Sequence, residues 1–312
     1  MPAPPKLAFV VATKDRPDEL RRMWRSLDRQ TRPPDEVVIV DASERPVSPD
    51  GFGPSSIALT YIRADRPSAA GQRNRGLETV SPDMDLIGFL DDDAVLEEDA
   101  VDAMLRFWEE ADDAVGGAAF NLVNHPPVDL EPLKRSRLAE SLGLYARRPG
   151  AVAPSGFQTM IGNVERTTGT DWLSSGASVW RREVFRAHRF DEWYRGYSYL
   201  EDLDFSYRVA KTFKLAVVAG ARYRHLPAAG GRGSGYTFGL REALNRIHFV
   251  RGNPKLSIAR CRMALALRML MSVTLAAKTA DPAFLGRALG NAVGLVRSAI
   301  ADQAGGSKEG CP

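Results

Sequence analysis

Short apolar runs alternate with amphipathic stretches along the first 120 residues, and this alternation limits the fold more than any other feature. Short apolar runs bounded by turn residues predict buried strands. Apolar residues at helical spacing, such as Leu20, Met23, Trp24 and Leu27 after Pro17, predict helices. Alternating strands and helices build a mostly parallel sheet with helices on both faces. We therefore predict an α/β fold with strands over 7–12, 37–40, 57–62, 86–90 and 115–120, and helices from Pro17, over 72–80 and over 97–110.

The rest of the chain divides into two stretches of different character. Residues 121–170 are rich in proline and glycine and show no pattern that predicts an element. From residue 236 to about residue 301 the chain is helical in pattern, with Arg and Lys spaced through Ala, Leu and Met. We expect a main domain over 1–235, with halves at 6–120 and 121–235, and a helical extension over 236–312 with a disordered tail.

Charge and cysteine content exclude several classes of protein. The net charge of +3, with both signs interspersed, is too small to favour nucleic acid as a partner. The two cysteines, Cys261 and Cys311, build no disulfide framework, which favours a reducing cytosol. The first residues lack the apolar core of a signal peptide, and no run approaches the roughly 20 apolar residues that span a bilayer. We expect a cytoplasmic protein, at most peripheral on the inner face of the cell membrane.

Three consecutive aspartates, Asp91, Asp92 and Asp93, follow the apolar run 86–90 directly. Side chains at the carboxyl end of such a strand emerge where open α/β sheets bind ligands. Carboxylates packed this closely repel one another unless a cation lies among them. Oxygen ligands suit Mg²⁺ or Mn²⁺, which commonly bridge to phosphates. The aspartates therefore predict either a metal–diphosphate site or a solvated acidic turn.

Polar residues also follow the other predicted strands. Thr13 and Arg16 come after the first strand, Asp41 ends the second, and Arg73 lies near the start of the helix over 72–80. An aspartate can accept hydrogen bonds from a nucleobase or a ribose hydroxyl, and an arginine near a helix start can meet a phosphate. Each residue alone is explained as a cap or a surface charge, but together they predict a shared ligand edge.

Three later features carry further chemistry. Glu201 and Asp202 begin a predicted helix, where a carboxylate serves either as a general base or as a complement to the helix dipole. His225 follows the predicted strand 215–219 and is a candidate metal ligand or phosphate contact, or a structural histidine. The glycine-rich loop 230–235 does not fit a dinucleotide fingerprint, and it is either a lid or a linker.

With these residues in view, the chain resembles the family 2 glycosyltransferases, which have the GT-A fold. Residues 10–17 with 35–43 resemble the family's first nucleotide-binding segment, and 71–76 resemble its arginine–asparagine–glycine segment. Leu90 to Asp93 match its DXD motif, 176–185 with 190–192 resemble its acceptor-side segment, and Glu201-Asp202 match its ED motif. The resemblance covers roughly residues 6–227. Two departures are Ala42, where many members have a second acid, and the unmatched stretch 121–170.

The resemblance implies a role for each matching residue. The nucleotide-sugar donor is expected in 6–120 and the acceptor in 121–235. Asp202 is expected to be the catalytic base. Donor binding is expected from Thr13, Arg16, Asp41, Arg73, Asp91 and Asp92, metal ligation from Asp91, Asp93 and His225, and acceptor-side roles from Gly176, Asp191 and Glu201.

The implied activity is an inverting, Mn²⁺- or Mg²⁺-dependent transfer of a hexosyl or deoxyhexosyl group. The donor would be a UDP-, dTDP- or GDP-sugar, and the acceptor a hydroxyl of a glycan or lipid-linked glycan in bacterial cell-surface polysaccharide synthesis, as in rhamnosyltransferases. Two alternatives remain at this point, a sugar nucleotidyltransferase and a non-catalytic nucleotide-sugar binding protein. The C-terminal helices are predicted to form a peripheral membrane surface, an ordinary helical subdomain or a homo-oligomer contact.

Overall fold

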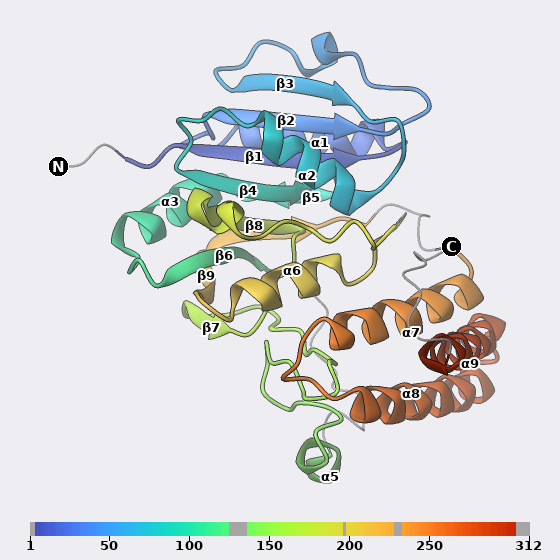
Figure 1. The fold of residues 1–312 in the computed structure, drawn as a ribbon. Coiled ribbons are helices and arrows are strands. Elements are labelled where there is room, and N and C mark those ends of the chain that lie inside the picture. The colour runs from blue at the N-terminus through green and yellow to red at the C-terminus, as the bar shows by residue number, and fades with distance from the viewer. Residues whose placement is uncertain (1–3, 125–135, 196–197, 228–232, 304–312) are drawn as a thin grey trace. The chain divides into compact units, whose positions relative to one another are not determined.

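The computed structural model describes residues 4–124, 136–195, 198–227 and 233–303 (Figure 1). The chain forms two compact units, one made of residues 1–129 and 161–229 and one made of 130–160 and 230–312. The sequence pattern assigned 121–235 to one half-domain, whereas the structure groups 130–160 with the C-terminal helices. The irregular composition of that stretch gave no signal of where it packs.

A nine-stranded sheet forms the centre of the first unit over the described residues. Its strand order is β3-β2-β1-β4-β8-β6-β9-β5, and β7 pairs with β9. The first four strands in this order are parallel, as the alternation predicts, while β8, β5 and β7 pair antiparallel with their neighbours. The strands are β1 (Leu7–Thr13), β2 (Glu36–Asp41), β3 (Ala58–Arg63), β4 (Leu86–Asp91), β5 (Ala94–Leu96), β6 (Val115–Leu122), β7 (Thr168–Thr170), β8 (Ala177–Arg181) and β9 (Lys214–His225).

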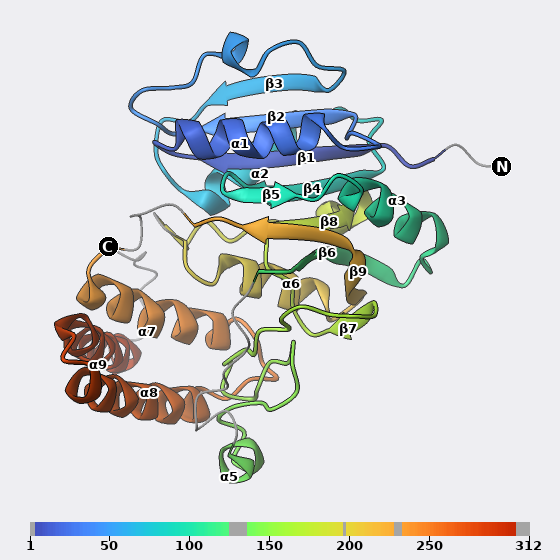
Figure 2. The ribbon, with the colours of Figure 1, turned by 180° about the vertical axis from the view of Figure 1, so that it is seen from behind.

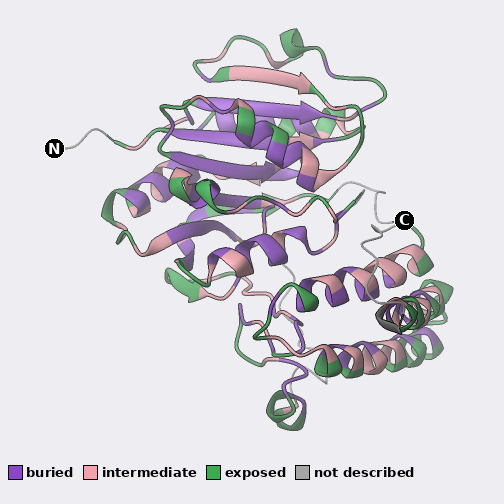
Figure 3. Ribbon diagram, viewed as in Figure 1, coloured by how far each residue is buried: buried purple, intermediate pink, exposed green. Residues whose placement is uncertain are grey.

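Helices cover both faces of this sheet. On one face α1 (Pro17–Asp28) and α3 (Ala100–Glu110) pack against the strands, and on the other lie α2 (Ala69–Thr79) and α6 (Glu201–Val209) (Figures 1 and 2). Two 3₁₀ helices, η1 (Pro49–Phe52) and η2 (Arg182–Arg186), complete the unit. The strands β1, β2 and β4 are buried through almost their whole length because both faces are covered (Figure 3).

Three boundaries differ from the sequence prediction by three residues or more, each for a local reason. The helix expected from residue 72 begins at Ala69, because the Ser68 hydroxyl accepts from the Gly71 amide and caps it. The helix expected from residue 97 begins at Ala100, because residues 94–96 form β5. Strand β9 continues to His225 instead of ending at 219, because β5 pairs with its last residues.

The second unit is helical, as predicted. It contains α5 (Arg137–Ser141), α7 (Gly235–Arg251), α8 (Ile258–Thr279) and α9 (Pro282–Gln303). The backbones of α7 and α9 are in direct contact at Gly239, where an added Cβ would lie 2.1 Å from the Arg287 carbonyl oxygen. None of the helices, over the ranges described, is long and apolar enough to cross a bilayer. Residues 230–232 of the glycine-rich loop, Cys311 and the predicted tail lie outside the described residues.

Candidate active site

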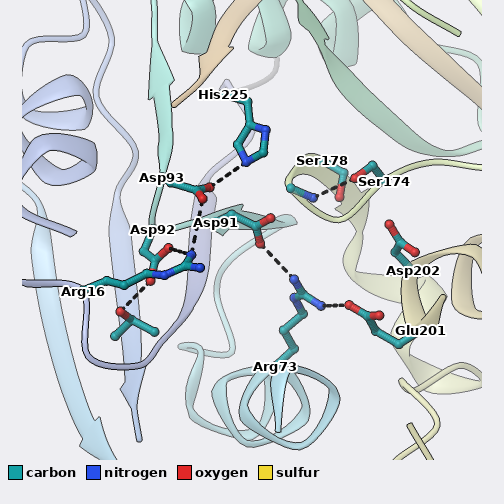
Figure 4. A network of polar contacts seen from close by, with 12 residues as sticks. Arg16, Arg73, Asp91, Asp92, Asp93, Ser174, Ser178, Glu201, Asp202 and His225 are labelled. Carbon is teal, nitrogen blue, oxygen red and sulfur yellow. Dashed lines mark hydrogen bonds and ion pairs between the residues drawn. The ribbon is translucent and has the colours of Figure 1, made fainter. Parts of the chain in front are cut away.

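The carboxyl ends of three parallel strands bring the predicted residues to one edge of the sheet (Figure 4). Thr13 ends β1 and lies in register with Asp41, which ends β2. Asp91 ends β4 and lies in register with Ala12 of β1. Parallel strands place their carboxyl ends on the same side, so adjacent registers bring these residues close together.

Asp92 anchors the loop that follows β1. Its carboxylate is buried and accepts hydrogen bonds from the Thr13 hydroxyl (2.8 Å) and the Arg16 guanidinium (3.0 Å). Burial raises the pKa of Asp92 to about 6, although Arg16 and Thr13 oppose this shift. The structure therefore places Asp92, Thr13 and Arg16 in one cluster, and their mutual contacts hold the β1–α1 loop at the site.

Asp93 joins that cluster to the end of β9. Its carboxylate lies 3.3 Å from Arg16 Nη1 and 3.1 Å from His225 Nε2. The pairing of Ala94 with His225 between β5 and β9 fixes this approach, and the Leu226 amide donates to the Asp93 carbonyl. Strand β5, which the sequence pattern did not predict, is thus the element that brings His225 to the aspartates.

Asp91 faces a different partner, Arg73 on α2. Arg73 is buried and donates from Nη2 to Asp91 (2.9 Å) and from Nη1 to Glu201 (2.7 Å). The Asp91 side chain remains 40% exposed, so it can still meet a ligand. Gly176 makes room for it, since a Cβ there would lie 3.1 Å from Asp91 Oδ2. One arginine therefore couples the DXD segment to the ED segment, which lies more than a hundred positions further along the chain.

Glu201 and Asp202 differ in their environment although they are adjacent. Burial, followed by the charge of Asp202, raises the pKa of Glu201 to about 8, while Arg73 opposes the shift. Burial also raises the pKa of half-buried Asp202, and Asp91 adds to this, whereas hydrogen bonds from the Leu203 amide and Ser174 act against it. A carboxylate with a raised pKa close to the DXD segment has the properties of a general base.

The backbone before these acids is strained. Leu200 has a left-handed conformation (φ 78°) at the N-cap of α6, where a non-glycine residue is disfavoured. Its side chain is buried, so packing holds the backbone in this conformation. Strain of this kind gathers at functional sites. Here it lies directly before Glu201 and Asp202.

Asp41, for which the resemblance implies a donor contact, has partners within the protein. It is fully buried and accepts from the Ser43 amide (2.7 Å), from Arg63 (3.4 Å) and from the Tyr61 hydroxyl. Burial and the bond to Asp41 raise the pKa of Tyr61 to about 12. In this structure Asp41 fixes the segments after β2 and β3 and offers no exposed oxygen to a ligand.

Two residues of α2 position the site, and the sequence reasoning gave them no role. Gln72 donates to the carbonyls of Thr13 (3.0 Å) and Val40 (2.7 Å), which ties the helix to the ends of β1 and β2. Asn74 donates to the Phe190 carbonyl (2.9 Å) and to Glu192 (2.8 Å). A signal for both existed, because they lie in the segment 71–76 that carries the resemblance.

Asp191 lies in the segment that Asn74 holds. Its carboxylate accepts from the Trp193 amide (2.9 Å) and shapes the turn after Phe190. Phe190 in turn packs under the Arg73 guanidinium, 5.4 Å from ring centroid to Cζ. The acceptor-side segment is thus joined to the donor-side helix through Asn74 and Arg73.

A pocket opens beside this edge between the end of β3 and the start of α2. It has a volume of about 260 Å³ and is lined by Ala64, Asp65, Arg66, Gly71, Gln72 and Arg75. Asp65, Arg66 and Arg75 give it charges of both signs. The sequence reasoning did not single out Asp65 or Arg66, since an Asp-Arg pair after a strand is common on protein surfaces.

The donor atoms at this edge fit a divalent cation in part. Within the described portion of the chain, no three His, Cys, Asp or Glu side chains are grouped so that they could hold a metal ion by themselves. Asp93 and His225 offer two donors 3.1 Å apart. Adjacent ligands of an octahedral ion with bonds of roughly 2.1 Å are separated by about 3 Å. Such ions complete their shell with water and substrate phosphates, so two protein donors suffice.

These features define a nucleotide-sugar-dependent transferase: a parallel half-sheet with acids at its carboxyl edge and a second acidic pair beside them. Residues 8–187, more than half of the chain, match the family model described as glycosyl transferase family 2. The chain belongs to this family of enzymes. No curated protein sequence matches the chain.

Solved structures show the same GT-A fold at low sequence identity. The mannosyltransferase PcManGT from Pyrobaculum calidifontis, in complex with GDP-Man and Mn²⁺, is 16% identical with a TM-score of 0.53, and the match covers 96% of this chain and 88% of that one. Residues 1–349 of S. aureus TarS are 14% identical with a TM-score of 0.54, over 95% and 82% of the chains. Another structure of S. aureus TarS is 16% identical with a TM-score of 0.51, and the match covers 84% of this chain but 42% of that one.

Proposed function

We propose that this enzyme transfers a hexosyl or deoxyhexosyl group from a nucleoside-diphosphate sugar to a hydroxyl of a glycan or lipid-linked glycan, with inversion at the anomeric carbon and with Asp202 as the base. One observation carries the proposal: the Asp202 carboxylate, whose pKa is raised by burial, lies within electrostatic reach of Asp91 and Arg73. A proton acceptor and a donor-binding edge therefore share one site.

The donor is held by the sheet edge. The partly exposed carboxylate of Asp91, which buried Arg73 holds in place, is available to the ribose and the diphosphate, while Thr13, Arg16 and Asp92 keep the first loop in place. We assign the nucleobase to the pocket of Asp65, Arg66 and Arg75, because Asp41 is buried and already bonded. The mixed charges of this pocket can pair with the polar edge of a uracil, thymine or guanine base.

The reaction needs one displacement. Asp202 accepts the proton of the acceptor hydroxyl, and the oxygen attacks the anomeric carbon from the side opposite the diphosphate. The new C–O bond forms as the bond to the diphosphate oxygen breaks, and the electron pair leaves with the nucleoside diphosphate. Because the raised pKa makes Asp202 a stronger base than an ordinary aspartate, the rate should fall as the pH drops through that pKa, above the usual value of 3.8.

Asp93 and His225 would hold a Mn²⁺ or Mg²⁺ ion, with Asp91 close by. Such an ion, when bound, neutralises the charge of the leaving diphosphate. The Mn²⁺ in the mannosyltransferase complex supports this assignment at the level of the fold. Arg16 lies 3.3 Å from Asp93 and offsets the charge of its carboxylate, so a metal ion must compete with that contact.

The decisive test is the Asp202→Asn variant of the full chain. We expect transfer from a panel of UDP-, dTDP- and GDP-sugars, including a rhamnosyl donor, to fall by about 10²–10⁴-fold. Donor binding, measured as the shift in melting temperature caused by each nucleotide diphosphate with Mn²⁺, should stay within about twofold of the wild-type affinity. The matched control is Asp113→Asn, since Asp113 is a fully exposed surface acid.

The alternatives give different results. A non-catalytic binding protein would show the melting shift without any transfer by the wild type. A nucleotidyltransferase would release pyrophosphate from a nucleoside triphosphate. Such enzymes carry a glycine-rich loop after the first strand, whereas this chain has Thr13 to Pro17, without glycine, at that position. If Asp202→Asn transfers sugar at the wild-type rate, Asp202 is not the base.

A further inference from the structure

Helix α9 carries its large apolar residues on the outside. The side that packs within the second unit has small or polar residues, with Ala288, Asn291 and Ser298 at 6%, 0% and 3% exposure. The outer side has Leu285, Leu289, Val296 and Ile300, which are 53%, 60%, 58% and 59% exposed. A helix stable in water normally buries its largest apolar residues and exposes its polar ones. The reversed arrangement indicates that the outer face belongs in another environment.

The exposed residues of α9 form one continuous stripe. Leu285, Leu289, Val296 and Ile300 recur at i, i+4, i+11 and i+15, and Ala292 lies in the gap between them. At 3.6 residues per turn these positions fall on one side of the helix. No charged residue interrupts the stripe between Leu285 and Ile300.

Helix α8 repeats this pattern. Its buried side is made largely of small residues, and its exposed side carries Met263, Leu270 and Val273, which are 44%, 57% and 45% exposed. Both helices show exposed positions along much of their length (Figure 3). Glycine, alanine and serine at helix contacts, with large apolar residues outside, are typical of helices that pack against one another in lipid.

The charges of this region are mostly positive. Residues 255–303, to the end of α9, contain seven basic residues and two acidic residues, Asp281 and Asp302. Arg268 and Arg287 contact the buried carboxylate of Glu242. Four others are exposed, namely Lys255, Arg260, Lys278 and Arg297. On the helical spacing, Arg260 and Lys278 both lie to one side of the Met263–Leu270 stripe, where a basic side chain can reach an anionic surface.

We propose that the exposed faces of α8 and α9 lie flat on an anionic lipid bilayer, with the apolar stripes in the acyl boundary and the basic side chains at the headgroups. Charge favours this occupant over a second copy of the chain. Two copies would bring mostly basic faces together with few acids to pair them, whereas an anionic leaflet complements them. Helices that lie parallel to the membrane surface also agree with the finding that no described helix is long and apolar enough to span a bilayer.

This proposal is independent of sugar transfer, and its test uses binding alone. The full chain is floated with phosphatidylcholine vesicles that either contain or lack a third of phosphatidylglycerol. We expect recovery with the anionic vesicles and background recovery with the neutral ones. Each basic residue near the surface should contribute about a fivefold factor to partitioning, so Arg260→Gln with Lys278→Gln should weaken it about 25-fold.

A second variant tests the apolar stripe. Leu289→Asp with Val296→Asp should abolish flotation, because each exposed apolar side chain contributes roughly a tenfold factor when it is buried in lipid. The matched control is Leu138→Asp, since Leu138 on α5 is 68% exposed and belongs to neither stripe. It should float like the wild type, and equal melting temperatures for all variants would show that they fold.

Three results would overturn the proposal. The first is background recovery of the wild type with anionic vesicles at low salt. The second is equal recovery with neutral and anionic vesicles, which would remove the role of the basic residues. The third is a dimeric mass by light scattering that the stripe variant abolishes, without flotation of the wild type, which would assign the stripe to a second copy of the chain.

Discussion

Two buried glutamates, one in each unit, are both bonded to an arginine yet have opposite shifts in pKa. Glu201 in the first unit contacts Arg73, and burial with the adjacent Asp202 raises its pKa to about 8. Glu242 in the second unit receives two bonds from Arg287 (2.9 and 2.6 Å), and Arg268 lies 3.6 Å away. Burial alone would raise the pKa of Glu242, but these arginines lower it.

The difference shows what each unit does with a buried charge. Around Glu201, three acids share one arginine, because Asp91, Glu201 and Asp202 all lie near Arg73, so negative charge is in excess and the proton affinity of Glu201 is raised. Around Glu242, the arginines outnumber the acid, and Asn291 adds a further bond (3.2 Å), so the charge is fully compensated and joins α7, α8 and α9. The first cluster raises the proton affinity of an acid at the proposed active site, and the second joins three helices.

The largest effect that separates the two clusters is expected from Glu242→Gln. Removing one partner of a buried ion pair leaves the arginines uncompensated, and the free energy of unfolding should fall by about 3–5 kcal/mol. Urea unfolding followed by helical circular dichroism measures this loss. The control is Asp281→Asn, an exposed acid between α8 and α9, which should change stability by less than about 0.5 kcal/mol. A similarly small loss for Glu242→Gln would show that the cluster does not hold the helices.

A smaller loss is expected from Gly290→Ala in α9. The added Cβ would lie 2.2 Å from the Tyr236 carbonyl oxygen, so α7 and α9 must separate, at a cost of about 1–3 kcal/mol. The matched control is Gly169→Ala in β7, where the added Cβ has room because the nearest atom, the Leu215 carbonyl oxygen, would be 3.8 Å away. If the two variants unfold at the same urea concentration, the close helix contact contributes nothing measurable.

The smallest effect is expected from Glu201→Gln at acidic pH. At pH 4, below both the folded pKa of about 8 and the unfolded value of 4.5, Glu201 is mostly protonated in both states and glutamine resembles it, so stability should change by less than about 1 kcal/mol. Because the folded pKa is raised above the unfolded value of 4.5, the wild type loses stability as the pH rises from 4.5 to 8. The variant has no such group and should therefore be the more stable protein at pH 9.

Glu242 should show the opposite pH dependence. Its pKa is lowered in the folded state, so its contribution to stability is present above the ordinary value of 4.5 and is lost as the pH falls through the lowered pKa. Urea unfolding of the wild type, Glu201→Gln and Glu242→Gln between pH 2.5 and pH 9 separates the two groups. A parallel pH dependence for both variants would contradict the comparison.

Local pattern was enough to predict most of the donor half. The apolar runs of β1, β2 and β4 and the amphipathic α1 follow from short-range periodicity, and the parallel pairing follows from their alternation. The pattern also predicted that Thr13, Asp91 and Arg73 lie at one edge, because parallel strands end on the same side. It failed at β5 because three residues are too short to show a period.

The amino-acid sequence by itself determined the α/β class, the acidic strand end and the family to which the chain belongs, since each depends on residues that are close together along the chain. Tertiary structure alone decided which of these acids stay exposed. Asp41 and Asp91 both end parallel strands, yet Asp41 is enclosed by Tyr61 and Arg63 while Asp91 stays partly exposed beside Gly176. It also decided the opposite pKa shifts of Glu201 and Glu242, because burial and the number of nearby arginines depend on segments that meet only in the folded chain.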